Sequence, residues 1–113
     1  YLYSCFDPNS EDELIQNFVK EYVDANGMQP DFVAANAYDS VYMLKAAIEK
    51  ADSFDREAIK DALYEVEFTG TQGTLRFKEN GDVEKVAVAF RIEDGEFVGL
   101  EGAFKLWDEF IAQ

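Results

Sequence analysis

The stretch ANAYDSVYMLKAAIEKA, residues 35–51, has the apolar spacing of one long amphipathic helix. Pro30 and Asp31 open this helix, and apolar side chains then recur at intervals of three and four residues. The face that we predict to be buried consists of Ala34, Tyr38, Val41, Leu44, Ile48 and Ala51. The side chains predicted to lie away from it are Asp39, Lys45, Glu49 and Lys50. A helix with one apolar side needs a neighbouring layer, so this stretch predicts a packed domain.

Two tyrosines lie one turn apart in this helix. Tyr38 is on the predicted buried face, so we expect its ring in the core and its hydroxyl on a hydrogen-bond partner. Tyr42 is on the flank, where both core packing and a place in an interface or pocket wall stay open.

Further elements are predicted on both sides of this helix. Residues 1–6, YLYSCF, predict a short buried strand. Ser10 and Glu13 match a capping box for a helix that ends near Ala25, before Asn26-Gly27. Asp55 can cap a third helix in which Ile59, Leu63 and Val66 face the core, so helices fill residues 10–66.

Residues 73–98 change to an alternating pattern, which predicts a β-hairpin. Leu75 and Phe77 alternate with charged neighbours, Asn80-Gly81 is a turn signal, and a second alternating run ends at Asp94-Gly95. That second run contains Val86, Val88, Phe90 and Ile92. In the tail, Phe104, Trp107, Phe110 and Ile111 have helical spacing, which predicts a last helix over 102–112. The fold class is therefore α/β, in a single domain with one core.

Composition excludes several functions. Lys+Arg number 10 against Asp+Glu 24, and the net charge of -14 repels nucleic acids and anionic lipid headgroups. No apolar run approaches the roughly 20 residues of a spanning helix, so the chain is predicted not to cross a membrane. Cys5 stands alone in an apolar run, which favours a buried side chain over a reactive thiol.

No catalytic, cofactor or metal motif is present. The chain has no histidine, and its seven glycines form no dinucleotide or phosphate-binding pattern. The acidic clusters at 7–13 and 78–84 lack the spacing of a calcium loop, and a turn and a helix cap account for them. We therefore expect no catalytic residues, no cofactor and no metal. Acid/base catalysis by paired carboxylates is kept only as a hypothesis for titration and substrate tests.

The order of the motifs resembles one family. PDFVAANAYDSVYMLKAAIEKA, then DREAIKDAL, then FTGTQGTLRFKENGD and VAVAFRIEDGEF, resembles the C-terminal third of type I periplasmic binding proteins. The similarity runs from about Phe6 to Phe97 and is greatest to the leucine/isoleucine/valine-binding subfamily that serves ABC transporters. Serine at position 40, where the family usually has alanine, is a mild departure, and the tail after Gly99 matches nothing in the family.

The resemblance implies a function and a place in a larger protein. Members have two α/β lobes that close about a hinge on an amino acid, with no covalent chemistry. It implies that residues 1–113 are a single C-terminal fragment, in which residues 1–6 lead to the hinge. The implied ligand contacts are Val33 or Phe32, with Asn36 within reach of the same end. It also implies an ABC transporter permease as partner, and a periplasmic or extracytoplasmic location, by lipid anchor or free.

A second hypothesis is a stand-alone acidic interaction module that binds no small molecule. Helices that evolved to be covered by other segments would leave apolar surface exposed, and soluble monomers rarely tolerate a large patch of that kind. We therefore expect a homodimer of this chain.

Overall fold

The computed structural model describes residues 2–99, so the helix predicted over 102–112 lies outside the described residues. The helices are α1 (Glu13–Asn26), α2 (Phe32–Ala51) and α3 (Arg56–Leu63). The strands are β1 (Leu2–Ser4), β2 (Phe68–Gly70), β3 (Gly73–Phe77), β4 (Val83–Glu84), β5 (Val88–Glu93) and β6 (Glu96–Gly99). The predicted α/β fold class, with a short first strand, amphipathic helices and a hairpin, is confirmed. The first strand was predicted to be buried, and this was wrong, since Leu2 is 44% and Tyr3 56% exposed.

The helix ends follow from local chemistry. Asp12 caps α1 by accepting the N–H groups of Leu14 (2.9 Å) and Ile15 (3.3 Å), so the prediction of Ser10 as cap was wrong. Ser10 Oγ instead accepts the Asp12 N–H, one step upstream. Gly27, at φ 72°, ends α1 in the left-handed region that glycine adopts at little cost.

The cap predicted for α3 is confirmed. The Asp55 carboxylate accepts the backbone N–H groups of Glu57 (3.1 Å) and Ala58 (3.0 Å). Such a cap satisfies donors that have no partner within the helix. Of the predicted core-facing residues, Val66 is buried, and Ile59 and Leu63 pack against the same cluster.

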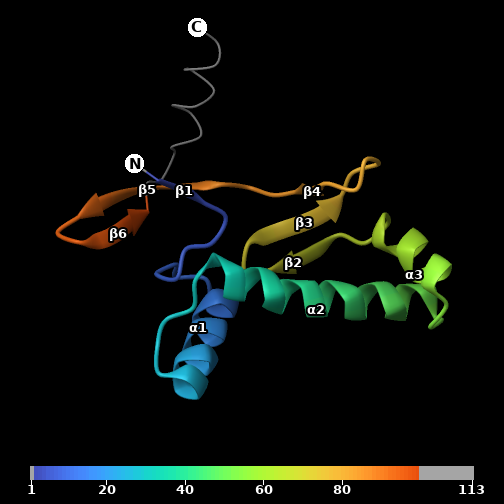
Figure 1. Cartoon of the computed structure of the whole chain (residues 1–113), viewed down its shortest axis with the longest axis horizontal. Helices are drawn as coiled ribbons and strands as arrows, with labels where there is room; N and C mark the ends of the chain where they lie inside the picture. Colours follow the sequence, from blue (N-terminus) through green and yellow to red (C-terminus); the bar gives the residue numbers. More distant parts are fainter. Residues whose placement is uncertain (1, 100–113) are drawn as a thin grey trace, which may run out of the picture.

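The strands form two antiparallel sheets, in the orders β1-β5-β6 and β2-β3-β4. The turn at Asn80-Gly81 joins β3 to β4, which confirms a hairpin there. The sequence predicts that the second alternating run pairs with β3, and this prediction is wrong. Val88–Glu93 instead pairs with β1, with Leu2 opposite Phe90, and turns at Asp94-Gly95 to pair with β6. One stretch of chain thus crosses from one sheet to the other (Figure 1).

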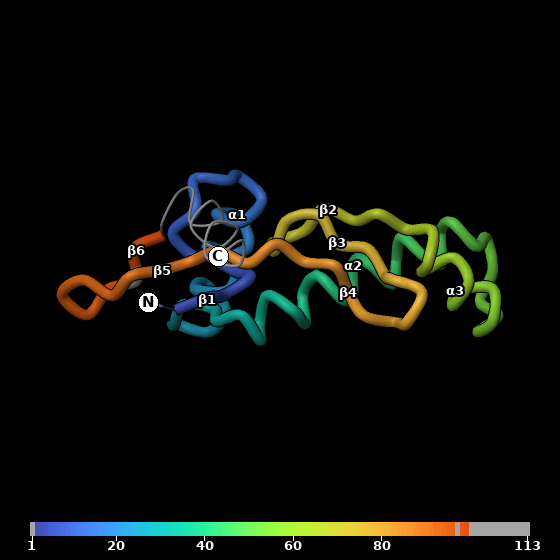
Figure 2. The backbone as a smooth tube through the Cα atoms, turned by 90° about the horizontal axis from the view of Figure 1, so that it is seen from above, coloured from blue at the N-terminus to red at the C-terminus, as the bar shows by residue number. Residues whose placement is uncertain are grey.

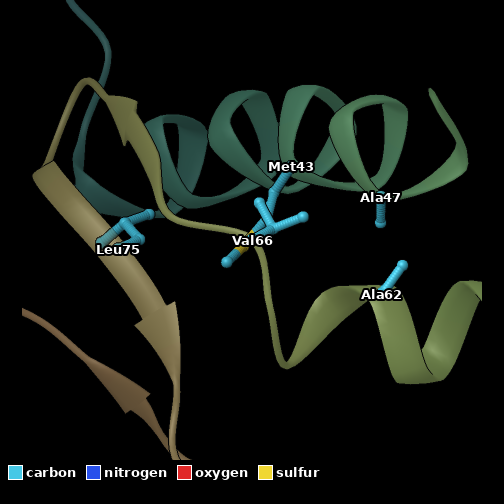
Figure 3. Close-up of a cluster of buried hydrophobic side chains, with 5 residues drawn as sticks. All are labelled: Met43, Ala47, Ala62, Val66 and Leu75. Carbon is cyan, nitrogen blue, oxygen red and sulfur yellow. The ribbon is translucent and has the colours of Figure 1, made fainter. Parts of the chain in front are cut away.

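Two hydrophobic clusters replace the single predicted core. The α1 core contains Phe6, Phe18 and Ala35, and Tyr38 packs against it. The α3 core contains Met43, Ala47, Ala62, Val66 and Leu75. In Figure 3, Ala47 of α2 and Ala62 of α3 point toward one another, and Leu75 reaches in from β3. Small side chains at this contact let the two helices approach closely.

The long helix α2 links both cores, but its buried face is not the predicted one. The buried positions are Ala35, Asp39, Met43 and Ala47, whereas Val41 is 68% and Leu44 47% exposed. The prediction placed Asp39 toward water, and Asp39 is buried. The buried face differs from the predicted one for two reasons. Asp39 binds the turn between β2 and β3, and the small side chain of Ala47 lets α3 pack closely against α2.

The described chain is open rather than compact. Seen from above, α3 and the β5–β6 turn lie at opposite ends of a thin molecule (Figure 2). This flat shape leaves apolar side chains of α2 exposed.

Candidate functional site

A cavity of about 500 Å³ lies where β1, the start of α2 and the chain between the sheets meet. Its apolar wall comes mainly from Leu2, Tyr3, Phe6, Pro8, Phe32 and Phe90. Its polar side chains are those of Asp31, Asn36, Gln72 and Lys85, with Ser4 and Cys5 also in the lining. Small-molecule sites have this character, a mostly apolar cavity with a few polar groups that orient the ligand.

The sequence-predicted contact residues lie on the first turns of α2. Phe32 and Asn36 are four positions apart on one side of the helix, and both line the cavity. Val33 is adjacent in sequence, but it is not among the lining residues and is 56% exposed. The structure thus brings two of the three residues to one cavity.

A hydrogen-bond network forms the polar end of the cavity. Asn36 Oδ1 accepts Gln72 Nε2 at 3.0 Å and Lys85 Nζ at 2.5 Å. Lys85 Nζ also donates to Gln72 Oε1 at 3.2 Å. The three side chains come from α2, the β2–β3 turn and the chain between the sheets. Each therefore holds the others in place at the point where these segments meet.

The buried carboxylate of Asp39 holds the Gln72 end of this network in place. Its carboxylate accepts Thr71 N at 2.8 Å, Gln72 N at 3.2 Å and Gln72 Nε2 at 3.2 Å. The contact requires glycine at position 70, where a Cβ would lie 2.4 Å from Asp39 Oδ1. A buried carboxylate with three N–H donors has the partners that a desolvated charge needs. It sets the position of Gln72 at the cavity.

The two tyrosines of α2 do not line the cavity. Tyr38 lies in the α1 core, with ring centroids 4.6 Å from Phe18 and 4.8 Å from Tyr42. A hydrogen bond with Tyr42, together with burial, raises the pKa of the Tyr38 hydroxyl to about 12. The packing role expected of Tyr38 is thus observed, and Tyr42 is 45% exposed beside it.

Sequence reasoning missed Gln72, Lys85 and Phe90 as cavity residues. A signal for Gln72 was present, since Gly70 and Gly73 bracket Thr71-Gln72 as in a tight turn. No sequence pattern predicts Lys85 as a cavity residue. It lines the cavity because β4 and β5 belong to different sheets and Lys85 lies on the segment between them. Within residues 2–99, no group of three or more acidic, cysteine or histidine side chains forms a candidate metal site.

A sequence model of the family described as periplasmic binding protein matches residues 1–96. The chain belongs to the periplasmic binding protein family. Over 80 residues it is 36% identical to the Leu/Ile/Val-binding protein homolog 3 of Brucella melitensis. The aligned part is 68% of this chain and 22% of that relative's length.

Solved structures of periplasmic binding proteins share the fold of this chain. The leucine binding protein LivK of Thermotoga maritima is 30% identical, with a TM-score of 0.71, over 87% of this chain and 29% of that one. The substrate-binding protein of Desulfitobacterium hafniense in complex with Leu is 29% identical, with a TM-score of 0.74, over 87% of this chain and 30% of that one. This chain thus spans under a third of these relatives.

Proposed function

We propose that this chain is part of the substrate-binding component of an ABC importer and helps to bind a branched-chain or other hydrophobic amino acid. Support comes from relatives named for leucine and for Leu/Ile/Val binding, and from the apolar cavity. The cavity volume falls within the roughly 300–1,000 Å³ typical of small-molecule sites. The role is binding without covalent chemistry.

The proposed ligand position follows from the chemistry of the cavity. The aromatic ring of Phe32, which is 57% exposed, offers apolar surface to an aliphatic side chain, and burial of that side chain there is favourable. The Asp31 carboxylate, which caps α2 through the Ala34 N–H, also lines the cavity and can accept from an ammonium group. The Asn36 amide lies at the polar end. We propose Phe32 and Asn36 as ligand contacts.

The proposed mechanism is closure about a hinge. The chain between β4 and β5 leads from one sheet to the other, and its Lys85 bonds to α2 and to the β2–β3 turn. A ligand that bridges these segments would favour the closed arrangement by its extra contacts there. In this proposal residues 1–113 are a C-terminal section of a two-lobed protein that delivers its ligand to a permease outside the cytoplasm. None of the helices among residues 2–99 has the length and apolar character to cross a membrane.

Titration of the full-length parent protein with leucine, isoleucine and valine, followed by NMR of labelled backbone amides, tests the proposal. The 113-residue chain alone should show no shift, because the segments that complete the ligand contacts are missing from it. In the parent, we expect the amide resonances of residues around the cavity to shift. Lysine and glutamate serve as control ligands and should produce no shift. Phe32→Ala should weaken binding, since it removes an apolar wall. Val33→Ala tests the third predicted contact, and its place outside the cavity predicts no change. Equal shifts with all five amino acids would contradict an apolar binding site.

A second proposal is that the chain pairs with a second copy. It is supported by the exposed side of α2, where Val41, Tyr42 and Leu44 are 68%, 45% and 47% exposed. Light scattering after size-exclusion chromatography measures the mass directly. A mass of 12.8 kDa at high concentration would reject the dimer.

A further inference from the structure

Two segments of chain cross between the sheet β1-β5-β6 and the helices. The first crossing leads from β1 to α1, and the second crossing, residues 85–87, leads from β4 to β5. They leave the sheet side by side, because Ser4 pairs with Val88 at its edge. Both border the cavity, since Cys5 and Lys85 line it. Bending of the two crossings would therefore change how far the cavity opens.

The first crossing is fixed on both sides of one residue. Ser4 pairs with β5 in the sheet, whereas Phe6 is 3% exposed in the α1 core, with its ring centroid 5.8 Å from that of Phe18. Cys5 lies between them, where the chain bends. The Ser4 hydroxyl accepts the Phe6 N–H at 3.1 Å, which closes a tight turn around Cys5. A change of direction in this crossing is thus confined to Cys5.

The second crossing is held by Lys85. Lys85 Nζ donates to Asn36 Oδ1 at 2.5 Å and to Gln72 Oε1 at 3.2 Å. Gln72 is itself bonded to the buried Asp39 carboxylate, so Lys85 joins the crossing to α2 and to the β2–β3 turn. Among residues 2–99, Lys85 is the one lysine or arginine that is not exposed. A cation in that position needs such partners, because desolvation disfavours its charge.

The chain on either side of Lys85 has few other restraints. Before it, β4 pairs with β3 over only two residues. After it, Val86 and Ala87 belong to no strand or helix, and Val86 is 58% exposed. The next residue fixed in the sheet is Val88. Lys85 therefore limits the unrestrained part of the second crossing to two residues.

We propose that the sheet and the helices bend relative to one another at Cys5 and at Val86-Ala87, and that Lys85 is a positioning residue that confines the second bend to that pair. This inference rests on the proposed function, since it assigns residues to the hinge on which closure depends. Hinges are a few loop or element-terminal residues that absorb a change in backbone angles. The anchor beside them sets how far the bend can spread along the chain.

A merely stabilising role for Lys85 makes a different prediction. Loss of a stabilising bond lowers the melting temperature but leaves the sheet and the helices in one fixed orientation. Loss of an anchor lengthens the free segment, so the sheet can reorient independently of α2 and α3. Residual dipolar couplings of backbone amides in a weakly aligned sample measure that orientation directly, and they require no ligand.

We would measure these couplings, with amide relaxation, on the labelled 113-residue chain and on Lys85→Met, Lys85→Arg and Lys78→Met. Methionine keeps an unbranched apolar stem, arginine keeps a charged donor, and Lys78 carries the same charge at an exposed position. A further variant, Ala87→Pro, restrains the backbone of the bending pair without removing the Lys85 side chain. Thermal melting of each variant checks that it folds.

We expect the sheet and the helices of the unchanged chain to fit one alignment, with added amide motion at Cys5, Val86 and Ala87. In Lys85→Met the couplings of β1, β5 and β6 should shrink relative to those of α2 and α3, and the motion should spread to residues 84 and 85. Lys85→Arg and Lys78→Met should keep the common alignment. Ala87→Pro should reduce the motion at Val86.

The outcomes separate this inference from the proposed function. A common alignment that survives in folded Lys85→Met, or motion at Val86 that is unchanged in Ala87→Pro, overturns the inference and leaves ligand binding by the parent protein untouched. Equal effects of Lys85→Met and Lys78→Met would assign the change to net charge and also overturn it. A sheet that reorients as expected, beside a parent protein that binds none of the amino acids, supports the bending points and rejects the proposed ligand.

Discussion

The Asp39 carboxylate accepts the backbone N–H of Thr71 at 2.8 Å, across 32 positions of sequence. This contact ties the middle of α2 to the turn between β2 and β3, and it determines which side of α2 is buried. Because Gln72 follows Thr71, the same contact sets the polar end of the cavity.

Replacement of Asp39 by alanine should be strongly destabilising. The backbone N–H groups of Thr71 and Gln72 would lose their acceptor, and buried donors left unpaired cost on the order of 3 kcal/mol together. Urea denaturation measures the loss. Asp61→Ala, at an exposed position of α3, serves as control and should change stability by no more than about 0.5 kcal/mol. Similar losses for the two variants would mean that the contact contributes nothing.

Gly70→Ala should disrupt the same contact from the other side. The added Cβ would lie 2.4 Å from Asp39 Oδ1 and 2.5 Å from Phe68 Cε1, so the carboxylate must move. In an Asp39→Ala background the added methyl group meets no carboxylate, and its cost should shrink. A double-mutant cycle by urea denaturation measures this coupling. Strict additivity of the two changes would argue against a shared cause.

Thr71→Val should preserve or raise stability. The Thr71 side chain is buried, and its Oγ1 has no hydrogen-bond partner among residues 2–99. Burial of an unpaired hydroxyl costs about 1–3 kcal/mol in protein mutants, and valine removes it with little change of shape. Thermal melting gives the direction, and Thr71→Ser, which keeps the hydroxyl and removes the methyl group, is the matched control. A marked loss in Thr71→Val would point to a hydroxyl partner outside the described residues.

Met43 and Leu44 are neighbours on α2 that test which face is buried. Met43 belongs to the α3 core, whereas Leu44 is 47% exposed. Met43→Ala should cost about 2–5 kcal/mol, because it leaves a cavity in the core. Leu44→Ala should cost well under that amount if this chain is the folding unit. Equal losses in chemical denaturation would show that a second copy or another segment covers Leu44.

The Tyr38 hydroxyl should titrate unusually late. Hydrogen bonding to Tyr42 and burial raise its pKa from 10.0 to about 12. The folded state holds this proton more tightly than the unfolded state, so the contribution to stability is complete below pH 10 and is lost as the pH rises toward 12. Ultraviolet titration of tyrosinate should show the late step, and Tyr42→Phe should move it down. Tyr64→Phe is the control, and an unchanged late step in Tyr42→Phe would refute the assigned cause.

Local chemistry made part of the fold predictable from residues alone. Asp55 as a cap, Asn26-Gly27 as a helix stop and Asn80-Gly81 as a turn were readable because each acts on backbone groups a few residues away. The cap at Asp12 was misassigned to Ser10, since both residues offer an oxygen acceptor and only backbone geometry decides between them.

The sequence does not show which segments far apart in the chain contact one another. Asp39 looked like a solvent-facing residue, because periodicity treats every charge as exposed and carries no information about a turn 32 positions later. The alternating run at Val88–Glu93 was correctly predicted to be a strand. Alternation does not say which strand pairs with it, and its partner is β1.

By itself, the sequence determined the helices, the turns, the acidic charge and the resemblance to solute-binding proteins. The ligand contacts that the resemblance implies at Val33, Phe32 and Asn36 stay predictions. Tertiary structure alone decided the rotation of α2, the division into two cores and the meeting of Lys85 with Asn36 and Gln72. The physical reason is the distance along the sequence between the groups that interact. Caps and turns are set by contacts within a few residues, whereas a cavity exists only after distant segments have packed.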